Sequence, residues 1–200
     1  MSFGYGVLLA LALLVVPGAI IARCGGLRWP AAVAVAPALT YGAVAMAIVP
    51  FGALGVPWNA GTALLTLVVV AGVIAGLRVL ARRIWTTPQG PERSRPPRGA
   101  TILVGGGVVL GAVLIWVAAA RGLANWQSIP STWDAVWHAN TIRFILDTGQ
   151  ASPTHMGELR NVETLEALYY PSAFHALAAV FAQVAGAAPA TAYAVFSVAV

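Results

Sequence analysis

Five apolar runs without Asp, Glu or Arg dominate this chain of 200 residues. They cover residues 3–22, 31–51, 61–77, 100–120 and 171–185. An α-helix needs about 20 residues, each rising 1.5 Å, to cross the roughly 30 Å hydrocarbon core of a bilayer. The first four runs meet this length and the fifth is marginal. The pattern predicts several transmembrane helices.

Composition agrees with this prediction. Hydrophobic residues make up 60% of the chain and charged residues only 8%, whereas soluble domains carry about 25% charged residues. The fold class expected is all-α: a polytopic transmembrane helix bundle with an interfacial helix in a long extracytoplasmic loop. We expect a multi-pass protein of the cell (inner) membrane whose immediate partners are membrane lipids.

The arginines predict the orientation of the helices. All eleven basic residues are arginine, and eight of them gather in the first and third loops, at positions 23, 28, 78, 82, 83, 93, 95 and 98. The second loop, residues 52–60, has none. The positive-inside rule therefore places loops one and three in the cytoplasm and the N-terminus outside. Topology explains the net charge of +5 better than binding to nucleic acid does, so no nucleic-acid partner is expected.

These features divide the chain into five parts. Three N-terminal transmembrane helices are expected in residues 1–85, an Arg/Pro-rich cytoplasmic linker in 86–99 and a fourth transmembrane helix in 100–121. Residues 122–170 form an extracytoplasmic loop with the candidate active site. Residues 171–200 hold a fifth transmembrane helix and the start of a sixth, which we expect to continue in a longer protein.

The polar residues point to the loop as the chemical centre. Five of the six carboxylates and all three histidines fall between Asp134 and His175. Ionisable groups are costly near a bilayer and are usually functional where they occur. The segment from Trp126 to His175 is therefore the candidate site.

One amphipathic helix is predicted inside the loop, over residues 132–148. Ser131 is the expected N-cap and Gly149 the expected C-cap. Asp134, His138 and Thr141 share one face, at 100° per residue. The opposite, mainly aromatic face holds Trp133, Val136, Trp137 and Phe144. We expect the aromatic face to rest in the headgroup region and the Asp/His face to meet water or a substrate cavity.

Two roles are open for Asp134 from its local sequence. It is either a structural cap that accepts backbone N–H bonds, or a general base that removes a proton from a hydroxyl. His138 either bonds Asp134 one turn away or only rests at the interface. Tyr170 and His175 mark the start of the fifth apolar run and are expected at the same membrane surface.

A divalent metal is a further possibility. Asp134, His138, His155 and His175 offer suitable O and N ligands, but no spacing matches a strong zinc signature such as His-Glu-x-x-His. No other cofactor is indicated.

The motifs Asp134-Ala-Val-Trp-His138, Ile142-Arg-Phe-Ile145 and Tyr170-Pro-Ser-Ala-Phe-His175 resemble the first outer loop of GT-C-type membrane glycosyltransferases. More closely, the arrangement is similar to an uncharacterised actinobacterial family of multi-spanning membrane proteins. The resemblance covers about residues 122–182. It implies a polyprenyl-phosphate sugar donor, a cell-envelope glycan acceptor and a loop carboxylate that acts on the acceptor, which Asp134 matches.

The function predicted is therefore a membrane glycosyltransferase on the extracytoplasmic face. Asp134 and His138 are the predicted catalytic residues. Arg143, Arg160, Tyr170 and His175 are the predicted substrate-binding residues, the arginines because they would offset the charge of a departing lipid phosphate. The alternatives are a transporter or lipid flippase, and a non-catalytic membrane assembly subunit.

Overall fold

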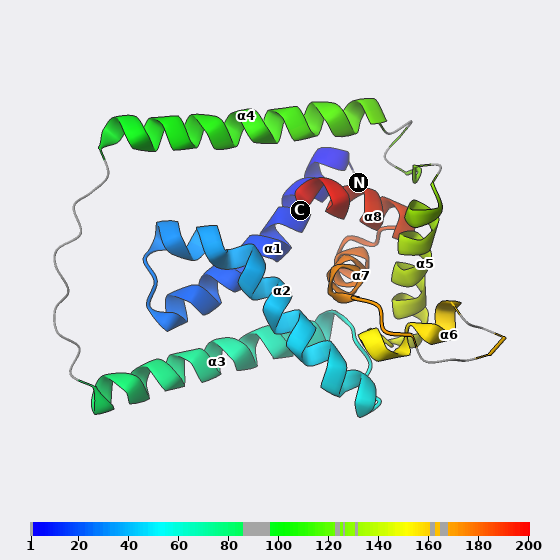
Figure 1. The fold of residues 1–200 in the computed structure, drawn as a ribbon, viewed down its shortest axis with the longest axis horizontal. Coiled ribbons are helices and arrows are strands. Elements are labelled where there is room, and N and C mark those ends of the chain that lie inside the picture. The colour runs from blue at the N-terminus through cyan, green and yellow to red at the C-terminus, as the bar shows by residue number, and fades with distance from the viewer. Residues whose placement is uncertain are drawn as a thin grey trace.

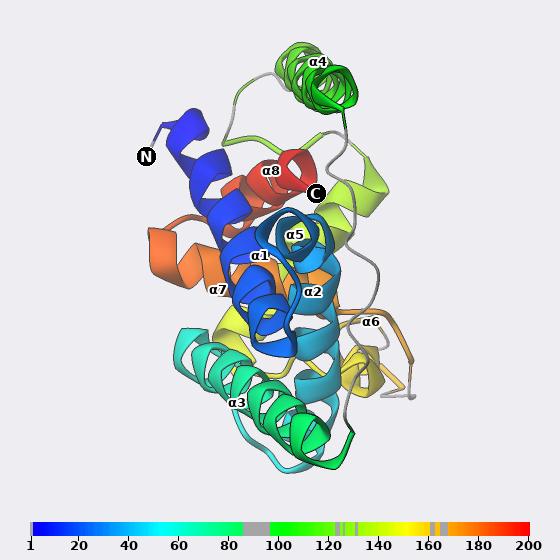
Figure 2. The ribbon, with the colours of Figure 1, turned by 90° about the vertical axis from the view of Figure 1, so that its left-hand side faces the viewer.

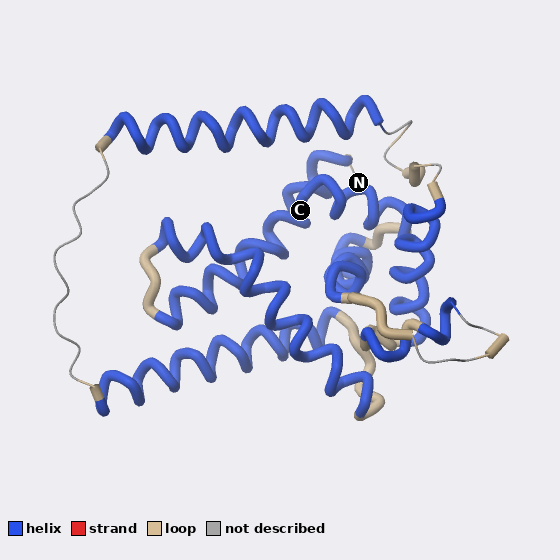
Figure 3. The backbone as a smooth tube through the Cα atoms, viewed as in Figure 1, coloured by secondary structure: helices blue, strands red, loops and turns tan. Residues whose placement is uncertain are grey.

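The computed structural model describes residues 2–85, 97–122, 125, 127–130, 132–160, 163–164 and 168–200. Helices and connecting loops account for this part of the chain, which contains no strand (Figure 3). The helices are α1 (Phe3–Gly25), α2 (Trp29–Ala53), α3 (Ala60–Ile84), α4 (Arg98–Gly122), α5 (Trp133–Thr148), η1 (Pro153–His155), α6 (Gly157–Arg160), α7 (Ala173–Ala185) and α8 (Pro189–Ala199) (Figure 1). The all-α prediction is confirmed. The predicted linker lies almost wholly outside the described residues.

The four predicted N-terminal spans are confirmed as helices. Each of α1 to α4 is long and apolar enough to cross a membrane, with 23 to 25 residues. Local sequence signals set their ends: α1 stops at Gly26, whose φ of 104° suits glycine, and α3 starts at an Asn59 capping box with Thr62. Arg78 of α3 donates to the last carbonyls of α1, Arg23 O and Cys24 O.

Small residues allow α1 and α2 to approach closely. Gly18 of α1 faces the backbone of Ala36, and a Cβ at Gly18 would lie 1.9 Å from the Ala36 oxygen. Beside it, the buried Thr40 hydroxyl donates to Leu14 O at 2.6 Å. Close packing of small residues and interhelical hydrogen bonds are the usual means of joining helices in lipid.

The two predicted C-terminal runs form the helices α7 and α8, which together are apolar enough for a membrane span but are sharply bent at their junction. α7 has 13 residues and α8 has 11, and the two meet at 117°. α7 begins at Ala173, with Ser172 as its N-cap. Gly186, with φ of 60°, ends α7, and Pro189 starts α8.

α3 and α4 run roughly horizontally in Figure 1, and α1 and α2 cross each other between them. In Figure 1 the arginine-bearing ends, at the α1–α2 turn, the end of α3 and the start of α4, lie at the left, and α5 to α8 lie at the right. α5 runs across the direction of α3 and α4, as an interfacial helix would. Figure 2 shows α4 apart from the other helices, and no residue of α4 is buried.

The arrangement leads to a labelling prediction. In a variant with Cys24 replaced by serine, a cysteine at the exposed Thr154 should react with a membrane-impermeant maleimide added to intact cells, and one at the exposed Arg83 should react only after permeabilisation. The reverse labelling pattern would show that the orientation is inverted.

Candidate functional site

α5 begins one residue later than predicted. Thr132 is the N-cap, and its side chain accepts from Ala135 N at 3.2 Å. Ser131, the predicted cap, lies outside the described residues. Asp134 is the second residue of the helix and is exposed. Thr132 therefore has the capping role that sequence alone left open for Asp134. The predicted C-cap, Gly149, is confirmed with φ of 72°.

The buried side of α5 differs from the prediction. A stripe of small and branched residues packs inward, namely Ala135, Ala139, Thr141, Ile142 and Ile145. This stripe overlaps the predicted Asp/His face, so most of that face contacts other helices. Trp133 and Val136 of the aromatic face point outward and are 91% and 41% exposed. The prediction that Thr141 faces water or a cavity was wrong, because packing against α7 and α8 covers it.

Trp58, in the loop between α2 and α3, holds this end of the molecule together. Its backbone N donates to Gly149 O at 2.8 Å and its indole Nε1 donates to Ala176 O at 3.0 Å. The side chain is only 1% exposed. A buried indole with a satisfied N–H joins the C-terminal end of α5 to α7 and thus sets the position of one helix on the other.

A histidine pair joins α5 to α7. His138 Nδ1 and His175 Nε2 are 2.8 Å apart, a hydrogen-bond distance. His138 is half-buried, and His175 is 1% exposed. Of the two alternatives open for His138, a bond to Asp134 or a place at the interface, neither foresaw this pair. Asp134 still affects His138 through its charge, but the structure shows no hydrogen bond between them.

Aromatic rings surround the pair. Tyr193 of α8 stacks on His138, with centroids 5.2 Å apart and planes 20° apart, and Phe174 meets it edge-on at 6.1 Å. Tyr170 lies 5.8 Å from His175. Tyr193 and Phe174 were not predicted at the site. Phe174 is part of the quoted motif that ends at His175, whereas Tyr193 has no signal beyond its place in an apolar run, where aromatic residues are ordinarily part of the core.

Asp134 lies in a hollow of about 480 Å³ beside the histidine pair. The hollow is lined by Trp133, Asp134, Trp137, Leu159 and Tyr170. Trp137 and Tyr170 contact edge-on at 5.4 Å, and Tyr170 in turn contacts His175. The prediction that Asp134 and Tyr170 meet at one site is supported by this lining. His138 is one helical turn from Asp134 on α5 and is half-buried, so it lies next to the lining residues without being one of them.

Of the two predicted arginine ligands, Arg143 lies away from the hollow. Arg143 is nine residues from Asp134, which puts it on the opposite side of α5 and about 14 Å along the axis. Its guanidinium Nε bonds Asp147 at 2.6 Å, and both side chains are exposed. Arg143 thus forms a surface ion pair and faces away from the site. The side chain of Arg160 lies outside the described part of the structure.

The four predicted metal ligands are not gathered. The described residues contain no group of three or more His, Cys, Asp or Glu side chains suited to a metal ion. His155 is on η1 and bonds Thr154. The nitrogens of His138 and His175 share a hydrogen bond, whereas two imidazoles on one zinc would each need about 2.0 Å to the ion.

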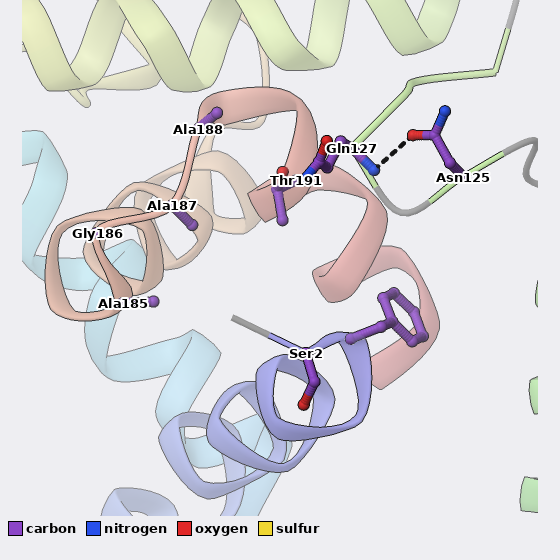
Figure 4. A pocket seen from close by; sticks show the side chains of 9 residues that line it. Ser2, Asn125, Gln127, Ala185, Gly186, Ala187, Ala188 and Thr191 are labelled. Atoms are coloured by element: carbon purple, nitrogen blue, oxygen red, sulfur yellow. Dashed lines mark hydrogen bonds between the residues drawn. The ribbon is translucent and has the colours of Figure 1, made fainter.

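A larger hollow, about 800 Å³, lies between the N-terminus of α1 and the α7–α8 turn (Figure 4). Ser2, Asn125, Gln127 and Thr191 supply its polar side chains, and Gln127 N donates to Asn125 Oδ1 at 2.9 Å. No ionisable side chain is among its described lining residues. Of the two hollows, the one beside α5 is the one with a carboxylate, Asp134, among its described lining residues.

Burial lowers the pKa of His138 below its ordinary value of 6.5, and the Asp134 carboxylate opposes this shift without cancelling it. The unfolded chain then binds the proton more readily than the folded one. The contribution of His138 to stability is complete above about pH 6.5 and is lost as the pH falls through the folded-state pKa.

Acidification should therefore destabilise the protein. We expect the thermal unfolding midpoint of the wild type to be lower at pH 5 than at pH 7.5. In His138→Gln the midpoints at the two pH values should differ by less. His155→Gln serves as the control, since His155 is outside the pair, and should keep the full difference. An unchanged difference in His138→Gln would contradict the link to this residue.

The fold and the site define an all-α, polytopic membrane protein with a carboxylate hollow and a histidine pair at one end of its long helices. The chain matches the family of unknown function DUF6541 over residues 11–200 and belongs to that family. No curated protein and no solved structure matches it significantly.

Proposed function

We propose that the protein is a membrane glycosyltransferase of GT-C type. It moves a sugar from a polyprenyl-phosphate donor to a cell-envelope glycan acceptor on the extracytoplasmic face. The observation that carries the proposal is the exposed Asp134 carboxylate in an aromatic-lined hollow. α5, which carries Asp134, lies at the end of the bundle opposite the α1–α2 turn and the end of α3 (Figure 1). The sequence resemblance of this segment to GT-C outer loops supports it.

The hollow suits a reaction between a lipid-linked donor and a polar acceptor. The outward-facing Trp133 is 91% exposed and provides an apolar surface at the expected membrane interface. Trp137 and Tyr170 offer aromatic walls next to a carboxylate, which is the usual make-up of a small-molecule site. A donor anchored in the bilayer would reach this site without leaving the lipid.

The chemistry assigns Asp134 the role of general base. The acceptor hydroxyl oxygen attacks the anomeric carbon and forms the new C–O bond. The bond from that carbon to the donor phosphate breaks, and its electron pair stays on the phosphate oxygen. The hydroxyl proton goes to the Asp134 carboxylate and then to water. Thr132 caps the helix, so Asp134 is not needed for that task.

Transport is the weaker alternative because the apolar middles of the long helices contain no Asp, Glu, His or Arg. Thr40 and Thr66 are the fully buried polar residues described in α1 to α4, and each hydroxyl donates to a backbone carbonyl. The Tyr41 hydroxyl of α2 is also buried, and it is a phenol without a charge at neutral pH. Transporters place binding groups near the bilayer midplane, usually at interrupted helices. α1 to α4 run unbroken from end to end.

Reconstitution tests the proposal. The protein in liposomes should transfer labelled sugar from a polyprenyl-phosphate sugar to a glycan acceptor supplied outside, and liposomes without protein should not. Movement of the donor between leaflets without a glycosyl product would favour a flippase. Neither activity, with preserved binding to a membrane partner, would favour an assembly subunit.

A further inference from the structure

The histidine pair can exist in two neutral arrangements. A neutral imidazole has one N–H and one bare nitrogen. Either His138 Nδ1–H donates to His175 Nε2, or His175 Nε2–H donates to His138 Nδ1, across the same 2.8 Å. The first arrangement makes both rings Nδ1–H tautomers, and the second makes both Nε2–H tautomers.

The surroundings of His175 favour the second arrangement. His175 Nδ1 is buried and has no hydrogen-bond partner within the described structure. The first arrangement would leave a buried N–H at this atom without an acceptor, and orphaned buried N–H groups are rare. The second leaves only a bare nitrogen there, and it gives both rings the Nε2–H form, which an imidazole side chain prefers in water.

Neither imidazole ring can easily flip to present its other nitrogen to the hydrogen bond between His138 and His175. His175 is 1% exposed and is held by Phe174 and Tyr170, with ring centroids 5.3 and 5.8 Å away. Tyr193 stacks on His138. His138 Nδ1 is engaged, so Nε2 is the ring nitrogen left for a ligand. In the second arrangement that nitrogen carries a proton.

We propose that His175 is a positioning residue which fixes His138 as an Nε2–H tautomer, and that His138 donates a neutral hydrogen bond to the phosphate oxygen that leaves the sugar. This inference rests on the proposed function. It changes the predicted role of His175, which is not a substrate ligand because it is buried. It also separates the two catalytic side chains, with Asp134 taking the proton and His138 stabilising the leaving group.

Neutral donation fits the charges near the pair. The ionisable groups that face it are Asp134 on α5, Tyr170 before α7 and Tyr193 on α8. No arginine contacts either ring in the described structure. Burial also favours the neutral imidazole. An N–H aimed at an oxygen that gains negative charge stabilises the transition state without reorganising, as preorganised donors do in other enzymes.

Nitrogen NMR tests the tautomer without any assay of activity. The full chain is labelled with ¹⁵N-histidine in detergent micelles, and His138→Gln and His155→Gln assign the signals. Wild-type His138 should show a protonated Nε2 and a bare Nδ1. His175→Gln, whose amide N–H can still donate, should keep this pattern, and His175→Leu should give mixed tautomers. A protonated Nδ1 in the wild type, or no effect of His175→Leu in a protein that gives a folded spectrum, would overturn the inference.

Phosphate titration tests the ligand. Dodecyl phosphate in the micelles should shift the His138 Nε2–H signal, and inorganic phosphate at the same concentration should shift it less if the lipid chain is part of recognition. Equal shifts would assign the site to phosphate in general. No shift with either would reject the phosphate role, even if the tautomer is as predicted.

Kinetics complete the test. His138→Phe should lower kcat by about 10² to 10³, the usual effect of losing one such donor, and His138→Gln should keep more activity because its amide can donate. Equal losses in the two folded variants would count against donation. If the wild type transfers no sugar, the proposed function fails, and the NMR and titration results still decide the tautomer and the phosphate contact.

Discussion

Asp134→Asn should lower glycosyl transfer by about 10² to 10⁴, the usual range for loss of a general base. Asparagine has nearly the same shape but cannot accept the hydroxyl proton. The fold should be preserved, since Asp134 is exposed and Thr132 caps the helix. Turnover is measured in proteoliposomes with a polyprenyl-phosphate sugar and is normalised to folded protein.

Asp147→Asn is the matched control for this variant. Asp147 is on the same helix and exposed, but it pairs with Arg143 away from the hollow, and its turnover should be unchanged. Thr132→Ala separates capping from catalysis: it should cost about 1 kcal/mol of stability and leave the rate per folded molecule as it was. Turnover near wild type in Asp134→Asn would remove the general-base role.

Gly18→Ala should be the most destabilising single-methyl change in the described part of the bundle. The new Cβ would lie 1.9 Å from the Ala36 oxygen and 2.7 Å from Thr40 Oγ1, so α1 and α2 must separate. Their separation also strains the buried Thr40 bond to Leu14 O. Overpacking typically lowers the free energy of unfolding by 1–3 kcal/mol. The new methyl group would meet the Ala36 backbone, which cannot move aside as a side chain can, so we expect a loss of about 3 kcal/mol.

Gly42→Ala is the control for packing. Gly42 is on α2, and a Cβ there meets nothing within 4 Å in the described structure. Alanine should leave stability unchanged or raise it by about 0.5–1 kcal/mol, because glycine is unfavourable inside a helix. Both variants are compared by denaturation in SDS and dodecyl maltoside mixtures. Equal midpoints would show that the α1–α2 contact tolerates a side chain at position 18.

Much of the fold could be predicted from local sequence. The four apolar runs became helices α1 to α4, because a chain in lipid must satisfy its backbone hydrogen bonds within each segment. The ends of α5 were predicted within one residue, since Gly149 is a C-cap with a positive φ. Asp134 and Tyr170 were predicted at one surface, and they line one hollow.

The errors came from contacts between distant segments. The buried face of α5 was misjudged because Ala135 and Ala139 contribute little to a hydrophobic pattern, yet they allow the helix to approach α7 and α8 closely. Arg143 was placed at the site on the basis of charge, although helical geometry already puts it opposite Asp134.

By itself, the sequence determined that this protein is a bundle of membrane-spanning helices with its polar chemistry at one end. The length, apolarity and capping residues of a helix are properties of its own segment, so they can be recognised in the sequence of that segment. Only the tertiary structure decided that His138 meets His175, 37 residues away, and that α7 turns back into α8. Both features depend on how the helices pack against one another. Packing depends on the shapes of the helix surfaces, and these shapes cannot be derived from the sequence pattern of one segment.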